Sequence, residues 1–120
     1  MKHTTATVFA GVNSGFNHLI RPMMYDAYHY ISNLTNPTAP ERLYTVVGNI
    51  CETDTFTWDR LLPEVREGDI LAFHNAGAYG FEMSSSFNSR TRPAEVLLDG
   101  GEARLIRRRQ TFEDLLAGQV

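Results

Sequence analysis

Cys51 is the only cysteine in the chain, and its type and position could support chemistry. It directly follows a run of mainly apolar residues, 43–50, and it precedes Glu52 and three further polar residues. Its thiol is therefore expected at the polar end of a strand, where a group with an ordinary pKa of about 8.5 could act as an acid near neutral pH. A lone cysteine is more often a small buried hydrophobic residue, so both interpretations stay open.

Arg21 and Tyr79 are the next candidates, because each presents a group that could bind an anion. Arg21 lies four residues before Tyr25 in a segment with helical spacing, so the two would share one face of a short helix. A guanidinium there could bind a carboxylate in bidentate fashion, although an ordinary surface arginine fits the pattern equally well. Tyr79 lies on a glycine-flanked turn, where its phenol could donate to an anion or simply pack.

Other familiar catalytic patterns are absent from the sequence. The four histidines have no spacing typical of metal ligands, and one cysteine does not make a zinc site, so no metal is predicted. The chain has neither a glycine-rich phosphate loop nor a Gly-x-Ser-x-Gly nucleophile turn.

Residues 77–93 form a long irregular stretch between two strand-like runs, 69–73 and 94–98. Neither a helical nor a strand period of hydrophobic residues runs through it. Long irregular connections are usually functional or disordered. Disordered stretches tend to lack apolar residues such as those found here, which are Tyr79, Phe81, Met83 and Phe87. We therefore predict an ordered, functional loop.

The composition is typical of one small globular domain, with 120 residues, 42% hydrophobic residues and 21% charged residues. The net charge of -3 argues against a dedicated nucleic-acid binder, and the basic run 107–109 is expected to be solvated or ion-paired. A single cysteine excludes an intrachain disulfide, and no apolar run approaches the roughly 20 residues of a membrane span. The cytoplasm is the expected location.

The elements that must position these residues are short. The patterns predict strands over 4–12, 43–50, 70–74, 94–98 and 102–107, and a short helix over 17–26 that Pro22 limits. A surface loop is expected over 33–41, a glycine turn over 99–101, and a final helical turn capped by Thr111 and Asp114. Gly48 indicates a bulge or a close approach of the backbone.

These elements indicate a mainly β domain with two short helices. Antiparallel pairing is expected, because no long helix is available for parallel crossovers. Residues 102–105 alternate between polar and apolar, as a half-buried strand does. A strand that starts almost at the first residue predicts that the chain continues from a longer one.

Five motifs, in order, resemble the C-terminal part of the diaminopimelate decarboxylase family. They span almost the whole chain apart from the loop over 33–41, and they are residues 17–29, 50–54, 77–80, 83–96 and 105–115. That family belongs to the alanine-racemase-like group of pyridoxal-phosphate enzymes, whose members have an α/β barrel followed by a mainly β, barrel- or sandwich-like domain. The resemblance implies that residues 1–120 are this second domain.

The resemblance also implies roles for the candidate residues. Cys51 matches the cysteine that gives a proton to the substrate carbon after decarboxylation, across a homodimer interface, and Glu52 matches a glutamate that contacts the substrate. Arg21 and Tyr25 match a pair that holds the distal end of the substrate. Tyr79 matches a tyrosine near both cofactor and substrate. The lysine that binds pyridoxal phosphate as a Schiff base would lie outside this chain, because Lys2, its only lysine, matches no family motif.

Two departures from the family pattern bear on the site. The family usually has an aspartate near residues 12–14, where this chain has none. The cysteine motif usually continues Glu-Ser-Gly-Asp, whereas this chain reads Glu52-Thr53-Asp54-Thr55, which could shift the loop that carries Cys51.

Two alternatives stay open. One is a decarboxylase of another basic amino acid, such as ornithine, arginine or carboxynorspermidine. The other is a non-catalytic β module that binds a partner.

Overall fold

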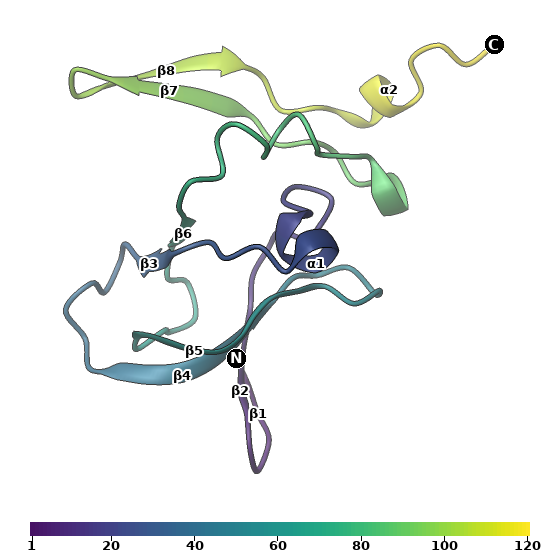
Figure 1. Ribbon diagram of the computed structural model, residues 1–120. Helices are drawn as coiled ribbons and strands as arrows, with labels where there is room; N and C mark the ends of the chain where they lie inside the picture. The colour runs from purple at the N-terminus through teal and green to yellow at the C-terminus, as the bar shows by residue number, and fades with distance from the viewer.

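The computed structural model describes all residues, 1–120, and consists mainly of strands in three small sheets (Figure 1). The largest sheet has the order β1-β2-β4-β5, formed by Lys2–His3, Val8–Gly11, Glu41–Val47 and Thr55–Pro63. The two other sheets are pairs, β3 (Ile31–Asn33) with β6 (Leu71–Phe73), and β7 (Glu95–Asp99) with β8 (Glu102–Arg107). The α-helices are α1 (Arg21–Tyr25) and α2 (Phe112–Leu115), and Phe87–Ser89 form a 3-10 turn. The expected mainly β architecture with two short helices is confirmed. No helix has the length and apolar character that crossing a bilayer requires.

Strand pairing departs from the prediction at one place. Four of the five pairings are antiparallel, but β2 and β4 run parallel, with Phe9 opposite Thr45. A parallel pair needs a long connection, and here residues 12–40 supply it through α1 and β3 without any long helix. The expected antiparallel pairing is therefore confirmed for four pairs of strands and wrong for β2 with β4.

Two further departures from the prediction concern the first strand and β5. The run over 4–12 is not one strand, because the Thr4 side chain accepts a hydrogen bond from the Thr7 backbone (3.0 Å) and turns the chain between β1 and β2. The nine-residue strand β5 was not predicted, and it is the longest in the chain. Its polar-apolar alternation breaks at Asp59, which has a positive φ of 41°. Positive φ is uncommon for a residue other than glycine.

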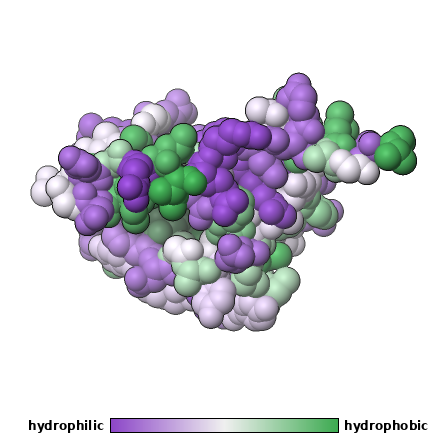
Figure 2. All heavy atoms as spheres, turned by 90° about the horizontal axis from the view of Figure 1, so that it is seen from above, coloured by the Kyte–Doolittle hydropathy of each residue, from purple (hydrophilic) through white to green (hydrophobic).

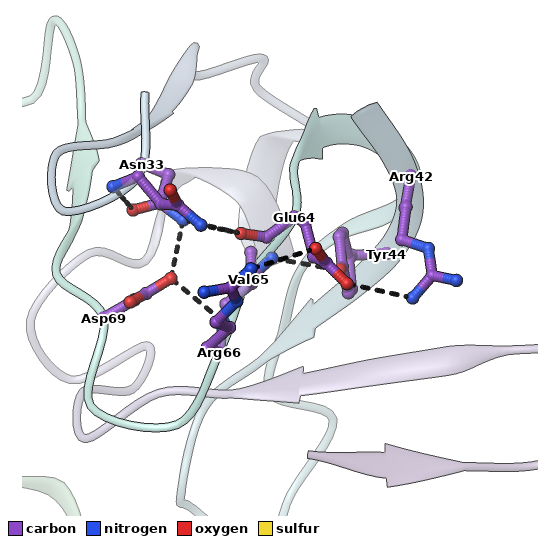
Figure 3. Close-up of polar contacts among 8 residues, drawn as sticks. Asn33, Arg42, Tyr44, Glu64, Val65, Arg66 and Asp69 are labelled. Atoms are coloured by element: carbon purple, nitrogen blue, oxygen red, sulfur yellow. Dashed lines mark hydrogen bonds and ion pairs between the residues drawn. The ribbon is translucent and has the colours of Figure 1, made fainter. Parts of the chain in front are cut away.

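The hydrophobic core lies where the large sheet meets α1 and the β3-β6 pair. Its buried members are Ala10, Leu19, Ile31, Tyr44, Val46, Phe56 and Leu62. Tyr44 is almost fully buried, and its hydroxyl accepts a hydrogen bond from the Val65 backbone (3.0 Å), so the phenol carries no unsatisfied oxygen (Figure 3). The Phe56 ring packs on Phe73 from β6 with a centroid distance of 4.7 Å.

Asn33, a buried residue at the end of β3, connects the β3-β6 pair to the segment after β5 through a partly buried polar network (Figure 3). Its amide nitrogen donates to the Glu64 carbonyl (3.1 Å) and to the Asp69 carboxylate (2.8 Å). Asp69 also accepts a hydrogen bond from the Arg66 backbone (2.9 Å). The Asn33 bond, followed by the Arg66 bond, holds the pKa of the Asp69 carboxyl below its usual value. The network fixes the turn between β5 and β6.

Residues 95–120 extend away from the large sheet as the β7-β8 hairpin and α2 (Figure 1). The predicted glycine turn is confirmed, with Gly100 and Gly101 both at positive φ. The expected half-buried strand is wrong, because every residue of β8 is exposed. On the facing strand, Leu98 remains 77% exposed. The apolar side chains of the hairpin, among them Leu98 and Leu105, are not covered by any other part of the chain. In the view from above, hydrophobic residues, coloured green, are open on the surface (Figure 2).

The basic run 107–109 is partly ion-paired and partly solvated, as expected: Arg107 and Arg108 have carboxylate partners, and Arg109 is exposed. Arg107 pairs with Glu95 across the hairpin, and Arg108 forms two bonds with Asp114, at 2.6 and 2.8 Å. The Arg108 guanidinium and the Thr111 backbone amide hold the pKa of the Asp114 carboxyl well below its usual value. Asp114 also closes the predicted capping box with Thr111 at the start of α2.

Candidate functional site

The site is built around the loop 48–54, which connects β4 to β5 and carries Cys51. The loop closes through a hydrogen bond from the Gly48 amide to the Asp54 carbonyl (2.7 Å). The Asp54 side chain is buried, and its two oxygens accept bonds from the backbone amides of Ile50 (3.0 Å) and Phe16 (2.7 Å). One carboxylate therefore fixes both the loop and the turn that leads to α1.

Two glycines leave the space that the Asp54 carboxylate occupies. A Cβ atom built at Gly48 would lie 2.0 Å from an Asp54 oxygen, and one built at Gly15 would lie 2.8 Å from the same oxygen. Real Cβ contacts are not this short, so both positions require glycine while Asp54 holds its place. The expected close approach at Gly48 is confirmed, although Gly48 follows β4 and does not lie inside a strand.

Cys51 is exposed at the tip of this loop, so the interpretation of a buried hydrophobic residue is wrong. Its sulfur accepts a hydrogen bond from the side-chain amide of Asn88, with a nitrogen–sulfur distance of 3.6 Å. Arg90 donates to the Asn49 carbonyl in the same loop (3.2 Å). The loop is thus held on its buried side by Asp54 and on its exposed side by Asn88, in the 3-10 turn, and by Arg90, which follows it.

Residues 77–93 are fixed against the rest of the chain, as predicted for an ordered loop. The Ser85 amide donates to the Asn17 carbonyl (2.8 Å), and the Phe87 ring packs on Phe16 with centroids 5.0 Å apart. His18 contacts the Thr91 carbonyl through its ring nitrogen (3.1 Å). All three contacts reach the turn before α1, so the loop, the turn and the Cys51 segment form one unit.

Arg21 and Tyr79 meet across the start of α1. The helix begins at Arg21, and Pro22 occupies its first turn, where the missing amide costs no hydrogen bond. The Arg21 guanidinium carbon lies 5.2 Å from the centroid of the Tyr79 ring, within the range of a cation–π contact. Tyr79 is 54% exposed and Tyr25, at the other end of the helix, is 62% exposed, so neither phenol is a packing group.

The structure thus brings together only some of the predicted residues. Arg21 contacts Tyr79, whereas the side chains of Tyr25 and Glu52 are exposed and make no hydrogen bond or ion pair within the chain. The partner of Cys51 is Asn88, which no sequence pattern singled out, and Asp54 likewise had no assigned role. The sequence did contain one indication of the role of Asp54. A glycine within a strand-like run, Gly48, predicts that another group lies close to its backbone, and that group is the Asp54 carboxylate.

Comparison with known proteins defines the family. The model of the pyridoxal-dependent decarboxylase C-terminal sheet domain matches residues 1–77, and the chain belongs to that family. Curated relatives that resemble it over most of its length include several diaminopimelate decarboxylases. One from Methanothermobacter thermautotrophicus is 55% identical over 92% of this chain, and one from Escherichia coli K12 is 50% identical over 91%.

Solved structures agree with this assignment. The crystal structure of diaminopimelate decarboxylase from M. jannaschii has a TM-score of 0.92 at 38% identity and covers 99% of this chain. Its co-complex with L-lysine has a TM-score of 0.91 at 37% identity. The chain spans only 26% and 29% of the two curated relatives and 27% of each M. jannaschii chain.

Proposed function

We propose that residues 1–120 are the C-terminal domain of a pyridoxal-phosphate-dependent diaminopimelate decarboxylase, which converts meso-diaminopimelate to L-lysine and carbon dioxide. The observation that carries the proposal is the exposed Cys51 thiol, held in a fixed loop at the end of β4 in a chain of this family. The parent enzyme would contain the α/β barrel as a further domain and act as a homodimer in the cytoplasm.

Cys51 is proposed as the proton donor, serving the active site of the partner subunit. When the substrate loses carbon dioxide, the electron pair of the broken bond stays on the substrate carbon. That pair takes the proton of the thiol, and the thiolate left behind is reprotonated from solvent. An exposed thiol at the tip of a fixed loop can reach a neighbouring site and is positioned before the reaction.

Four other residues are proposed to bind the substrate. Arg21 would hold the distal carboxylate with its guanidinium, and the exposed phenol of Tyr25 would contact the same end. Glu52, next to the thiol and exposed, would attract an amino group of the substrate. Tyr79 would contact both substrate and cofactor, because its exposed phenol suits an anionic group while its ring lies against Arg21.

Pyridoxal phosphate, when bound, withdraws electrons from the substrate carbon. The chain fits this cofactor only in part, through the phenol of Tyr79. Its single lysine, Lys2, lies in β1 at the outer edge of the large sheet. We therefore propose that the Schiff-base lysine belongs to the barrel of the parent enzyme.

The other basic amino-acid decarboxylases are the second candidates. A lysine/ornithine decarboxylase from Vibrio vulnificus, in complex with cadaverine, has a TM-score of 0.62 at 19% identity, which is a likeness of fold alone. The M. jannaschii co-complex with L-lysine is closer in sequence and fold, so it favours diaminopimelate as the substrate.

Substrate profiling of the parent enzyme tests the proposal. With pyridoxal phosphate, the parent should release carbon dioxide from meso-diaminopimelate in preference to ornithine, arginine and carboxynorspermidine. The 120-residue chain, given the same cofactor, should release none, because it lacks the proposed Schiff-base lysine. A preference for another substrate, or turnover by the short chain alone, would contradict the proposal.

Arg21→Ala in the parent enzyme is expected to raise KM for diaminopimelate by about ten-fold or more. A charge-assisted bidentate contact with a carboxylate contributes about 1.5–3 kcal/mol, and its loss weakens substrate binding. Steady-state kinetics measure the change, and Arg42→Ala, at an exposed ion pair on β4, is the matched control. A KM close to that of the control would make Arg21 a structural residue.

A further inference from the structure

Asn88 has a backbone conformation that few side chains adopt. Its φ and ψ are 56° and 28°, and the following Ser89 also has a positive φ of 56°. Among residues other than glycine, asparagine tolerates this left-handed region best, but two in succession are uncommon. Such conformations persist where surrounding contacts enforce them, and they occur often at functional sites.

The contacts that enforce this conformation surround the 3-10 turn. The Ser89 and Arg90 amides donate to the carbonyls of Ser86 (2.9 Å) and Phe87 (3.2 Å). The Phe87 ring anchors the turn on Phe16. The turn is thus fixed before and after Asn88, and its side chain is directed at the Cys51 loop.

The amide of Asn88 donates to the Cys51 sulfur at 3.6 Å, a distance suited to a nitrogen–sulfur hydrogen bond. An amide group is neutral, so it can donate to the sulfur whether the thiol carries its proton or has lost it. A hydrogen bond to an ionised acceptor is roughly twice as strong as one to a neutral acceptor. The contact therefore strengthens when the proton leaves the sulfur.

None of the charged side chains near Cys51 has a hydrogen bond to its sulfur. The Asp54 carboxylate is bound to the Phe16 and Ile50 amides, and the Arg90 guanidinium is bound to the Asn49 carbonyl. Glu52 is exposed and adjacent in the chain. Asn88 is the group that contacts the sulfur itself.

We propose that Asn88 is a positioning residue for Cys51, orienting the thiol toward the substrate carbon and stabilising the thiolate that remains after the proton is transferred. This inference rests on the proposed function only for its catalytic part. The contact itself can be tested on the 120-residue chain, in which Cys51 is the sole thiol.

The test is the rate at which iodoacetamide alkylates Cys51, measured against pH. Asn88→Gly removes the amide while glycine adopts positive φ freely, so the loop keeps its path. Its alkylation rate near neutral pH should fall by about three- to ten-fold, the equivalent of one ordinary hydrogen bond to the thiolate. Asn88→Asp should lower the rate further, because a carboxylate repels the thiolate. Thr53→Ala, an exposed neighbour without side-chain hydrogen bonds, should leave it unchanged.

Thermal unfolding of each variant separates a local effect from a loss of fold. Coincident alkylation profiles for the wild type and both Asn88 variants, at unchanged melting temperatures, would overturn the inference. In the parent enzyme, Asn88→Gly should lower kcat several-fold at a similar KM. If Asn88→Gly shifts the alkylation profile but leaves kcat normal, only the catalytic part of the inference is refuted. If a variant that lacks Cys51 shows normal turnover, the proposed function of Cys51 itself fails.

Discussion

Cys51→Ala in the parent enzyme is expected to lower kcat for diaminopimelate by about 10²–10⁴-fold, with a much smaller change in KM. General acid catalysis typically contributes a factor of this size, and a residue that gives its proton after carbon dioxide leaves should contribute little to substrate binding. Because the thiol is exposed, removing it should not change the stability of the domain. Steady-state kinetics and thermal unfolding of the same samples measure both quantities, with Thr53→Ala as the control.

The same variant tests whether Cys51 serves the partner subunit. Mixing Cys51→Ala chains with chains that lack the Schiff-base lysine should form dimers in which one of the two sites is complete. Partial activity should then return in the mixture, although each parent variant alone is nearly inactive. If Cys51→Ala alone keeps most of its turnover and the mixture gains nothing, the catalytic assignment fails.

Asp54→Ala is expected to lower the free energy of unfolding by about 3–5 kcal/mol. The buried carboxylate accepts bonds from the Phe16 and Ile50 amides, each worth about 1.5–3 kcal/mol when the acceptor is charged. Urea denaturation of the 120-residue chain measures the change, provided that unfolding is two-state. Asp54→Asn, which keeps the shape and one acceptor oxygen, should cost less.

Gly48→Ala reaches the same carboxylate by a steric route, because its new Cβ would overlap the Asp54 side chain. It should lower the free energy of unfolding and also release the Cys51 loop from its fixed position, which urea denaturation and the alkylation profile of Cys51 measure. Wild-type stability in Asp54→Ala would show that the carboxylate does not hold the two segments together.

The parts of the fold that the sequence predicted are those with strong local signals. The β7-β8 turn follows from consecutive glycines at 100 and 101, and the capping box of α2 follows from Thr111 and Asp114. The strand before Cys51 follows from its β-branched residues. In each case the residues that decide the conformation are neighbours in the chain, so a short stretch of sequence is enough to predict the local structure.

The parts that could not be predicted depend on distant residues. The parallel pairing of β2 with β4 joins segments more than thirty residues apart, and its cause is the burial of both strands in one core. The exposure of β8 could not be read from its alternation, which is compatible with burial against something outside the chain. Within the site, the contact of Arg21 with Tyr79 and that of Cys51 with Asn88 depend on the path of a long irregular loop.

Gly15, Gly48 and Asp54 limit which sequence changes the domain can accept. Gly48 is required by the position of the Asp54 carboxylate, and Gly15 by that carboxylate together with the Ile50 side chain. The carboxylate keeps its position only in the space that both glycines leave. The three positions should therefore vary together among relatives, and a substitution at one should become tolerable only after the others have changed. When segments are exchanged between relatives to alter substrate preference, a crossover between residues 15 and 54 could separate this set. Junctions placed before residue 15 or after residue 54 keep it intact.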